Sequence, residues 1–245
     1  MHKTLTIAAC QMPYVEEDIE QSIKLMLSYA QKAEARAAQL VCFPECYLQG
    51  YVVSERSADL AIDLSSIGFQ TILSQFKPLK PIIVFGLIER EGKNIFNTAA
   101  VIKKGQLLGR YRKHKLVGTE NDFFKAGNDF PIFELEDIKF GINICYDLNF
   151  SDCARAVSEQ GAQLLVCPSN NMMRFETAEK WKGKHNLSRA ERAKETKLHL
   201  VSADVTGKHK NKVSYGPTAV INPQGKVITQ VPLMTEGLIT QDIQF

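Results

Sequence analysis

Three residues that could support nucleophilic catalysis lie where strand-like segments end. Cys145 follows the alternating segment FGINI, Glu45 follows the apolar segment VCFP, and Lys113 follows the strand-like segment GRYR. Loops at strand ends converge above a rigid scaffold, so ligands tend to bind there. These segments therefore offer one thiol, one carboxylate and one ammonium group for chemistry.

Together these groups fit one mechanism, the attack of a cysteine on an acyl carbon. A free thiol is only slightly ionised at neutral pH, so it needs a base to take its proton and a positive charge to favour the thiolate. Glu45 could be the base and later the acid for a leaving amine, and Lys113 could stabilise the thiolate and an oxyanion. Either charge alone is more simply explained as a solvated loop residue, so the prediction depends on the combination.

A papain-like cysteine hydrolase would need a histidine base instead. The chain has five histidines, and none of them lies in a recognisable motif. The glutamate–lysine–cysteine combination is therefore the preferred interpretation.

The composition is typical of a globular enzyme. A chain of 245 residues with 44% hydrophobic content can bury a full core, and one domain over residues 1–245 is expected. Thirty basic and 27 acidic side chains leave a formal charge of only +3, which argues against binding to nucleic acid or to an anionic membrane.

No apolar segment approaches the length of about 20 residues that spans a bilayer, and the start of the chain lacks the features of a signal peptide. The six cysteines form no CxxC pair, and core packing is the expected role of five of them. A cytoplasmic protein is predicted.

Strand-like segments recur along the chain, with helical patterns between several of them. The strands are predicted at residues 5–10, 40–43, 81–88, 97–102, 140–145, 164–167, 198–205, 218–221 and 237–243. The clearest helix covers residues 16–39, a second follows the cysteine and ends at Gly161, and hairpin turns are predicted at 103–106 and 222–226. Helices and hairpins together predict mixed sheets with helices outside them.

The contexts of the three residues resemble the nitrilase superfamily of carbon–nitrogen hydrolases. FPECYLQGY is similar to the family pattern PExxLxGY, YRKHKL to YRKxxL, and GINICYD to GxxICYD. Weaker matches follow the same order, namely IAACQM, CPSN, RAKE and YGPTAVINPQGKV, so the resemblance spans nearly the whole chain. It implies an α/β fold, a four-layer α-β-β-α sandwich, and a catalytic triad of Glu45, Lys113 and Cys145.

The resemblance also implies roles for neighbouring residues. Glu120 would be a second glutamate that orders the site, and the backbone N–H of Tyr146 would join Lys113 in the oxyanion hole. The substrate-binding residues that it suggests are Tyr51, Asn149, Asn170, Asn171, Met172 and Arg174.

One of these positions departs from the family. Many members carry an arginine where this chain has Asn149, so the family's specificity for acidic substrates is not carried over. Arg174 is the nearest candidate to replace that charge, although a solvated helix start explains it more simply.

The predicted function is an amidase-type hydrolysis of a small amide or carbamoyl compound through a thioester on Cys145, with release of ammonia or an amine and a carboxylic acid. The alternatives are a true nitrilase acting on a C≡N bond and a non-catalytic scaffold of the same fold. No metal or organic cofactor is implied. A homodimer or higher homo-oligomer is expected, although the family's C-terminal tail, which often pairs subunits, is nearly absent.

Overall fold

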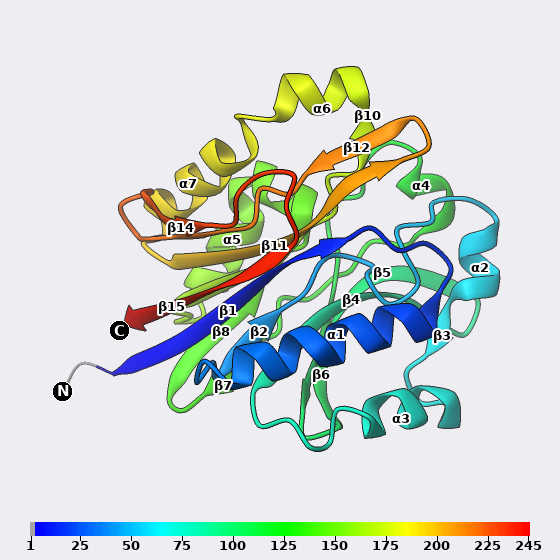
Figure 1. Ribbon diagram of the computed structural model, residues 1–245, viewed down its shortest axis with the longest axis horizontal. Helices are drawn as coiled ribbons and strands as arrows, with labels where there is room; N and C mark the ends of the chain where they lie inside the picture. Colours follow the sequence, from blue (N-terminus) through cyan, green and yellow to red (C-terminus); the bar gives the residue numbers. More distant parts are fainter. Residues whose placement is uncertain (1–2) are drawn as a thin grey trace.

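The computed structural model describes residues 3–245, and its strands form two facing sheets with helices outside them (Figure 1). We call them the N-terminal sheet, in the order β6-β5-β4-β2-β1-β15, and the C-terminal sheet, in the order β7-β8-β9-β11-β13-β14. They join where the end of β1 pairs in parallel with β11, with Gln11 opposite Asp204.

The strands are β1 Thr4–Pro13, β2 Leu40–Cys42, β3 Ile62–Asp63, β4 Ile82–Glu91, β5 Asn94–Lys103, β6 Gln106–Arg112, β7 Phe133–Leu135, β8 Ile138–Ile142, β9 Leu164–Pro168, β10 Met173–Arg174, β11 His199–His209, β12 Lys212–Tyr215, β13 Ala219–Ile221, β14 Val227–Gln230 and β15 Gly237–Gln244. The helices are α1 Ile19–Glu34, α2 Arg56–Leu60, α3 Ile67–Ser74, α4 Glu120–Phe123, α5 Ser151–Ser158, α6 Phe175–Trp181 and α7 His185–Thr196, with a 3₁₀ helix η1 at Cys145–Asn149.

Each sheet has a parallel centre and antiparallel edges. In the N-terminal sheet β1, β2 and β4 run in parallel, while β5, β6 and β15 are antiparallel to their neighbours. In the C-terminal sheet β8, β9 and β11 run in parallel, while β7, β13 and β14 are antiparallel. The predicted mixture of crossover helices and hairpins is therefore confirmed.

The core has three layers because both faces of both sheets are covered. Along β1, Ile7 and its alternate neighbours pack between the sheets, whereas Cys10 and its alternate neighbours pack under α1 and α3. On the other side, Val157 of α5 and Ala193 of α7 pack on the C-terminal sheet. A strand covered on both faces is apolar at nearly every position, which accounts for the segment LTIAAC. The predicted four-layer sandwich is confirmed.

Several element boundaries differ from the sequence prediction, and those of α1 and β8 have clear local causes. Helix α1 begins after Asp18, whose side chain accepts a hydrogen bond from the Gln21 backbone N–H at 2.9 Å, and it ends before Ala37, which has a positive φ of 60°. Strand β8 ends at Ile142 and not at Cys145, because the chain turns into η1 there. Within residues 3–245 no helix is both long enough and apolar enough to cross a bilayer.

Candidate active site

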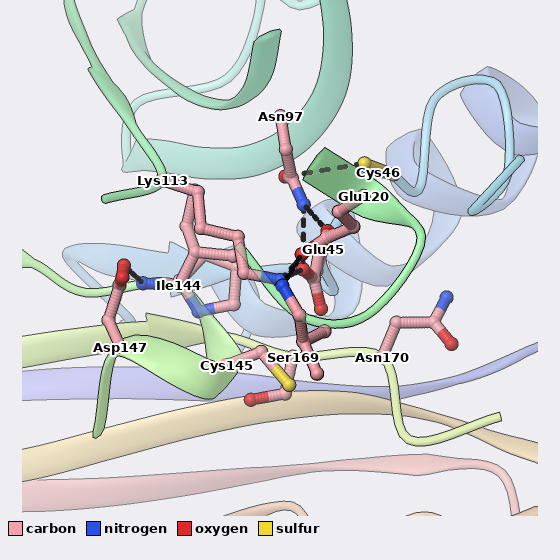
Figure 2. Close-up of polar contacts among 12 residues, drawn as sticks. Glu45, Cys46, Asn97, Lys113, Glu120, Ile144, Cys145, Asp147, Ser169 and Asn170 are labelled. Atoms are coloured by element: carbon pink, nitrogen blue, oxygen red, sulfur yellow. Dashed lines mark hydrogen bonds and ion pairs between the residues drawn. The ribbon is translucent and has the colours of Figure 1, made fainter. Parts of the chain in front are cut away.

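Glu45, Lys113 and Glu120 meet in one buried cluster with Asn97 (Figure 2). The Lys113 Nζ atom lies 2.7 Å from Glu45 Oε1 and 2.9 Å from Glu120 Oε1. Asn97 Nδ2 donates to the same two oxygens at 2.8 and 3.0 Å. All three charged side chains are only 1% exposed, so the ion pairs are shielded from solvent. One ammonium shared by two carboxylates gives the cluster a net negative charge.

Glu45 reaches this cluster because the turn after β2 lies directly on strand β4. The Gly86 backbone N–H donates to the carbonyl of Pro44 at 3.0 Å. A Cβ atom on Gly86 would lie 2.1 Å from the Cys46 nitrogen and 2.6 Å from the Glu45 Cα atom. Only glycine permits this approach, so the absence of a side chain on β4 sets the place of the carboxylate.

Lys113 and Glu120 stand at the two ends of a short loop. The Lys113 backbone N–H donates to the carbonyl of Asn97 at 2.8 Å, which continues the pairing of β6 with β5 for one residue. Glu120 begins α4, and its Oε2 atom accepts a hydrogen bond from the Val117 backbone N–H at 2.8 Å. The loop therefore folds back on itself, so that the Glu120 carboxylate lies next to the Lys113 ammonium group.

Cys145 is held in a conformation that L-residues rarely adopt. Its φ of 44° lies in the left-handed region, which costs about 1–3 kcal/mol for a residue other than glycine and is concentrated at functional sites. Its Sγ atom lies 4.0 Å from Asn171 Oδ1. Cys145 is partly exposed, whereas the other five cysteines are buried. The turn therefore brings this cysteine, unlike the other five, to the wall of a cavity.

The pKa values of the cluster define its resting charges. Burial raises the pKa of Cys145 well above its ordinary value, Glu45 adds to this effect, and Lys113 opposes it. Burial also raises the pKa of Glu45, with the attraction of Lys113 offsetting only part of the shift. Burial alone would lower the pKa of Lys113, but the neighbouring carboxylates outweigh it and hold the pKa well above its ordinary value. The resting site therefore combines a neutral thiol with a base and a permanent cation.

A cavity of about 380 Å³ opens above this cluster. It brings together nine of the residues predicted to form the site. These are Glu45, Tyr51, Lys113, Cys145, Tyr146, Asn149, Asn170, Asn171 and Met172.

Two predicted site residues lie elsewhere. Glu120 stands behind Lys113 and not in the cavity wall. Arg174 does not line the cavity either: it is exposed on β10, where it pairs with Lys212 of β12. The backbone pairing of β10 with β12 keeps Arg174 at the edge of the sheet. Its side chain is exposed to solvent, which agrees with the interpretation of Arg174 as a solvated residue at a helix start.

The remaining cavity wall has no counterpart in the sequence motifs. It comes largely from the segment of α6 and α7, and its members are Val117, Leu148, Met173, Thr177, Trp181, His185, Ser188 and Arg189. Trp181 and His185 lie four residues apart in the segment AEKWKGKHNLSR, which is mostly polar, so a solvated helix is the natural interpretation of it from sequence alone.

Arg189 and His185 would each add a positive charge to the cavity if the guanidinium were unpaired and the imidazole were protonated. Arg189 Nη2 lies 3.3 Å from Asp204 Oδ2 and donates to Ser169 Oγ at 3.0 Å, so its charge is compensated. Burial lowers the pKa of His185 to about 3, which leaves the ring uncharged at neutral pH. The wall is therefore apolar or neutral at every position apart from the Glu45–Lys113 cluster and the Arg189–Asp204 pair.

Asn97 and Asp147 are also absent from the predicted site. Asn97 fixes the two carboxylates, and its only signal in the sequence is a polar side chain within the apolar strand NIFNTAAVIK. Asp147 is buried and follows Cys145 by two residues. Across residues 3–245 no three His, Cys, Asp or Glu side chains gather so that they could hold a metal ion.

A model of the carbon–nitrogen hydrolase family matches residues 6–245. The chain belongs to this family. Among its relatives, the Schizosaccharomyces pombe protein named "Probable nitrilase" is 31% identical over 97% of this chain and 88% of its own length. An omega-amidase of Xenopus tropicalis is 28% identical over 94% of this chain and 84% of its own length.

Solved structures agree with this assignment. An amidase from Nesterenkonia sp. superposes with a TM-score of 0.83 and 26% identity, over 98% of this chain and 90% of that one. A glutamine-dependent NAD+ synthetase from Acinetobacter baumannii superposes with a TM-score of 0.86 and 25% identity. This alignment covers 98% of the present chain but only 45% of the synthetase chain.

The predicted enzyme class is confirmed. This carbon–nitrogen hydrolase acts through a cysteine, and its partly exposed Cys145 with the nearby glutamate and lysine fits the triad of the family. One structure of the Nesterenkonia amidase carries acrylamide added to its active-site cysteine. The predictions that no metal and no organic cofactor take part remain predictions.

Proposed function

We propose that this hydrolase is an amidase for small uncharged amides or carbamoyl compounds, with Cys145 as the nucleophile. The observation that carries the proposal is the buried Glu45–Lys113–Glu120 cluster in contact with the cavity that also holds the only partly exposed thiol. It provides a base, a cation and a nucleophile in one desolvated place.

In the first step Glu45 takes the thiol proton while the Cys145 sulfur bonds to the carbonyl carbon. The electrons of the C=O double bond move to the oxygen, and the Lys113 ammonium with the Tyr146 backbone N–H stabilises the oxyanion. The protonated Glu45 then gives its proton to the nitrogen, the C–N bond breaks, and ammonia or an amine leaves. A thioester on Cys145 remains.

In the second half of the reaction a water molecule attacks the thioester. Glu45 takes a proton from the water, the C–S bond breaks, and the proton returns to the sulfur as the carboxylic acid leaves. Lys113 keeps its proton throughout, because its pKa is held well above the ordinary value. Glu120 acts through Lys113, which it keeps in place at 2.9 Å.

The acid limb of the pH profile tests the role of Glu45. Its pKa is raised, so the ionised form that can accept the thiol proton is lost as the pH falls through this raised value. We expect kcat/KM to decline toward acid pH with a midpoint above the ordinary glutamate value of about 4.3. Circular dichroism at each pH controls for unfolding, and a midpoint at or below the ordinary value would contradict the assignment.

The cavity favours uncharged acyl groups. Arg189 is paired with Asp204, His185 is neutral, and Arg174 lies outside the cavity. A substrate carboxylate would thus enter a neutral or apolar wall beside a cluster of net negative charge. Leaving such a charge without a partner costs about 1–3 kcal/mol or more.

We expect kcat/KM for uncharged amides to exceed that for ω-amides of dicarboxylic acids by about tenfold or more, as that cost requires. The measurement is ammonia release from matched pairs of equal chain length. The omega-amidase relative makes the comparison informative. If the dicarboxylic ω-amides are preferred, and Arg174→Ala raises their KM selectively, Arg174 is a carboxylate clamp and the preference is reversed.

A nitrilase is the second candidate, because the Schizosaccharomyces pombe relative is named a probable nitrilase. An ammonia-release panel of amides, carbamoyl compounds and nitriles separates the two, since highest turnover on nitriles would favour this alternative. A non-catalytic scaffold would release no ammonia from any of them. It would also show no preferential alkylation of Cys145 by iodoacetamide.

We further propose that the enzyme works in the cytoplasm as one domain and as a homodimer or higher homo-oligomer. All six cysteines are free thiols, as is usual for proteins of a reducing compartment. The family model over residues 6–245 supports one domain. Sedimentation equilibrium would test the oligomeric state, and a monomer at micromolar concentration would contradict the proposal.

A further inference from the structure

A fully buried carboxylate stands behind the nucleophile without lining the cavity. Asp147 is 0% exposed, and its two oxygens accept four hydrogen bonds from the protein. Oδ1 accepts from the backbone N–H groups of His114 at 3.2 Å and Lys115 at 2.7 Å. Oδ2 accepts from the backbone N–H of Ile144 at 2.9 Å and from the hydroxyl of Tyr111 at 2.8 Å.

The four donors belong to two segments that are far apart in the sequence. Tyr111, His114 and Lys115 flank Lys113 on the N-terminal sheet, whereas Ile144 directly precedes Cys145 on the C-terminal sheet. Figure 2 shows Asp147 bonded to Ile144, the residue directly before Cys145. One carboxylate therefore connects the segment that carries the ammonium with the segment that carries the thiol.

We propose that Asp147 is a positioning residue that sets the distance and direction between the Cys145 thiol and the Lys113 ammonium. The inference rests on the proposed function, in which these two groups act on the same substrate carbonyl. Misplacement of reacting groups by about 1 Å can cost about 10²-fold in rate. A buried carboxylate with all its hydrogen bonds satisfied is rigid enough to prevent such a shift.

A purely local role for Asp147 would need fewer of these contacts. Bonding to Ile144 and to the first turn of η1 requires only the Ile144 N–H as donor. The other three hydrogen bonds all reach the Lys113 segment. A second bridge between the same segments, Lys115 Nζ to Asp152 Oδ2 at 2.6 Å, lies at the surface, with the two side chains 31% and 58% exposed. It provides a matched control, because exposed ion pairs contribute little.

Asp147→Asn tests the link between the two segments with little change in side-chain volume. Its NH₂ group must replace one oxygen. In the Oδ1 position it would face two backbone N–H groups, but in the Oδ2 position it would face the Ile144 N–H and a Tyr111 hydroxyl that can rotate to accept. The second orientation loses fewer bonds. The variant should therefore keep the Lys113 segment in place and release the turn of Cys145.

The experiment measures kcat, KM, melting temperature and the rate of Cys145 alkylation by iodoacetamide for the wild type, Asp147→Asn and Asp152→Asn. For Asp147→Asn we expect kcat to fall about 10²-fold with KM changed less than about threefold. Alkylation should slow, because a thiol farther from Lys113 ionises less. Asp152→Asn should match the wild type in all four measurements.

A lower melting temperature with unchanged kcat and unchanged or faster alkylation would overturn the inference, since a merely structural role predicts that pattern. If Asp147→Asn does not fold, Tyr111→Phe removes one of the four bonds and should lower both kcat and the alkylation rate, by about two- to tenfold. Wild-type rates in that variant would also overturn it. Alkylation needs no amide substrate, so failure of the amidase proposal would appear separately, as a wild type that alkylates at Cys145 but hydrolyses no amide.

Discussion

Replacing Cys145 by alanine is expected to abolish amide hydrolysis while the fold stays intact. The substitution removes the nucleophile, and removal of a catalytic nucleophile lowers kcat by at least about 10⁴-fold in comparable hydrolases. It also removes few packing contacts, because Cys145 is partly exposed and lines the cavity. Steady-state ammonia release and a thermal melt are the measurements.

Two other cysteines are the matched controls. Cys42 and Cys153 are buried, and burial raises the pKa of both thiols, that of Cys153 to about 12. Their alanine variants should lower the melting temperature more than they lower kcat, as expected for packing residues. Activity of the Cys145→Ala variant within a few fold of the wild type would end the thioester mechanism.

Replacing Lys113 by arginine is expected to lower kcat strongly, although the charge is kept. The ammonium lies between two carboxylate oxygens at 2.7 and 2.9 Å and is 1% exposed, which leaves no room for a larger planar guanidinium. Loss of an oxyanion-stabilising donor costs about 10²–10³-fold in kcat. We expect a loss of this size from kinetics, with circular dichroism to check the fold.

Glu45→Gln should cause a comparable loss, since an amide cannot accept the thiol proton. Lys115→Arg is the control for the lysine change, because Lys115 is partly exposed and pairs at the surface with Asp152. It should retain near wild-type kcat. Unchanged kcat in Lys113→Arg would mean that charge alone suffices, and unchanged kcat in Glu45→Gln would remove the glutamate from the reaction.

Much of the fold could be predicted from local patterns. Strands such as β1 and β4 are apolar on both alternating sets of residues because both of their faces are covered, and this pattern survives in the sequence without knowledge of their partners. Boundaries were less predictable. The ends of α1 depend on a hydrogen bond that the Asp18 side chain accepts and on the left-handed Ala37, which periodicity does not reveal.

The sequence by itself determined the chemical groups: a cysteine, a glutamate and a lysine at three strand ends, in contexts that resemble one hydrolase family. Only the tertiary structure decided which side chains join them. Asn97 bonds to Glu45 across 52 positions and Tyr111 to Asp147 across 36, so these contacts depend on how strands pair and sheets face each other. The same holds for charge. The charge of Arg189 is compensated because α7 packs beside β11, which carries Asp204. Arg174 is solvated because β10 forms a sheet edge. The residues next to these arginines in the sequence do not predict either outcome.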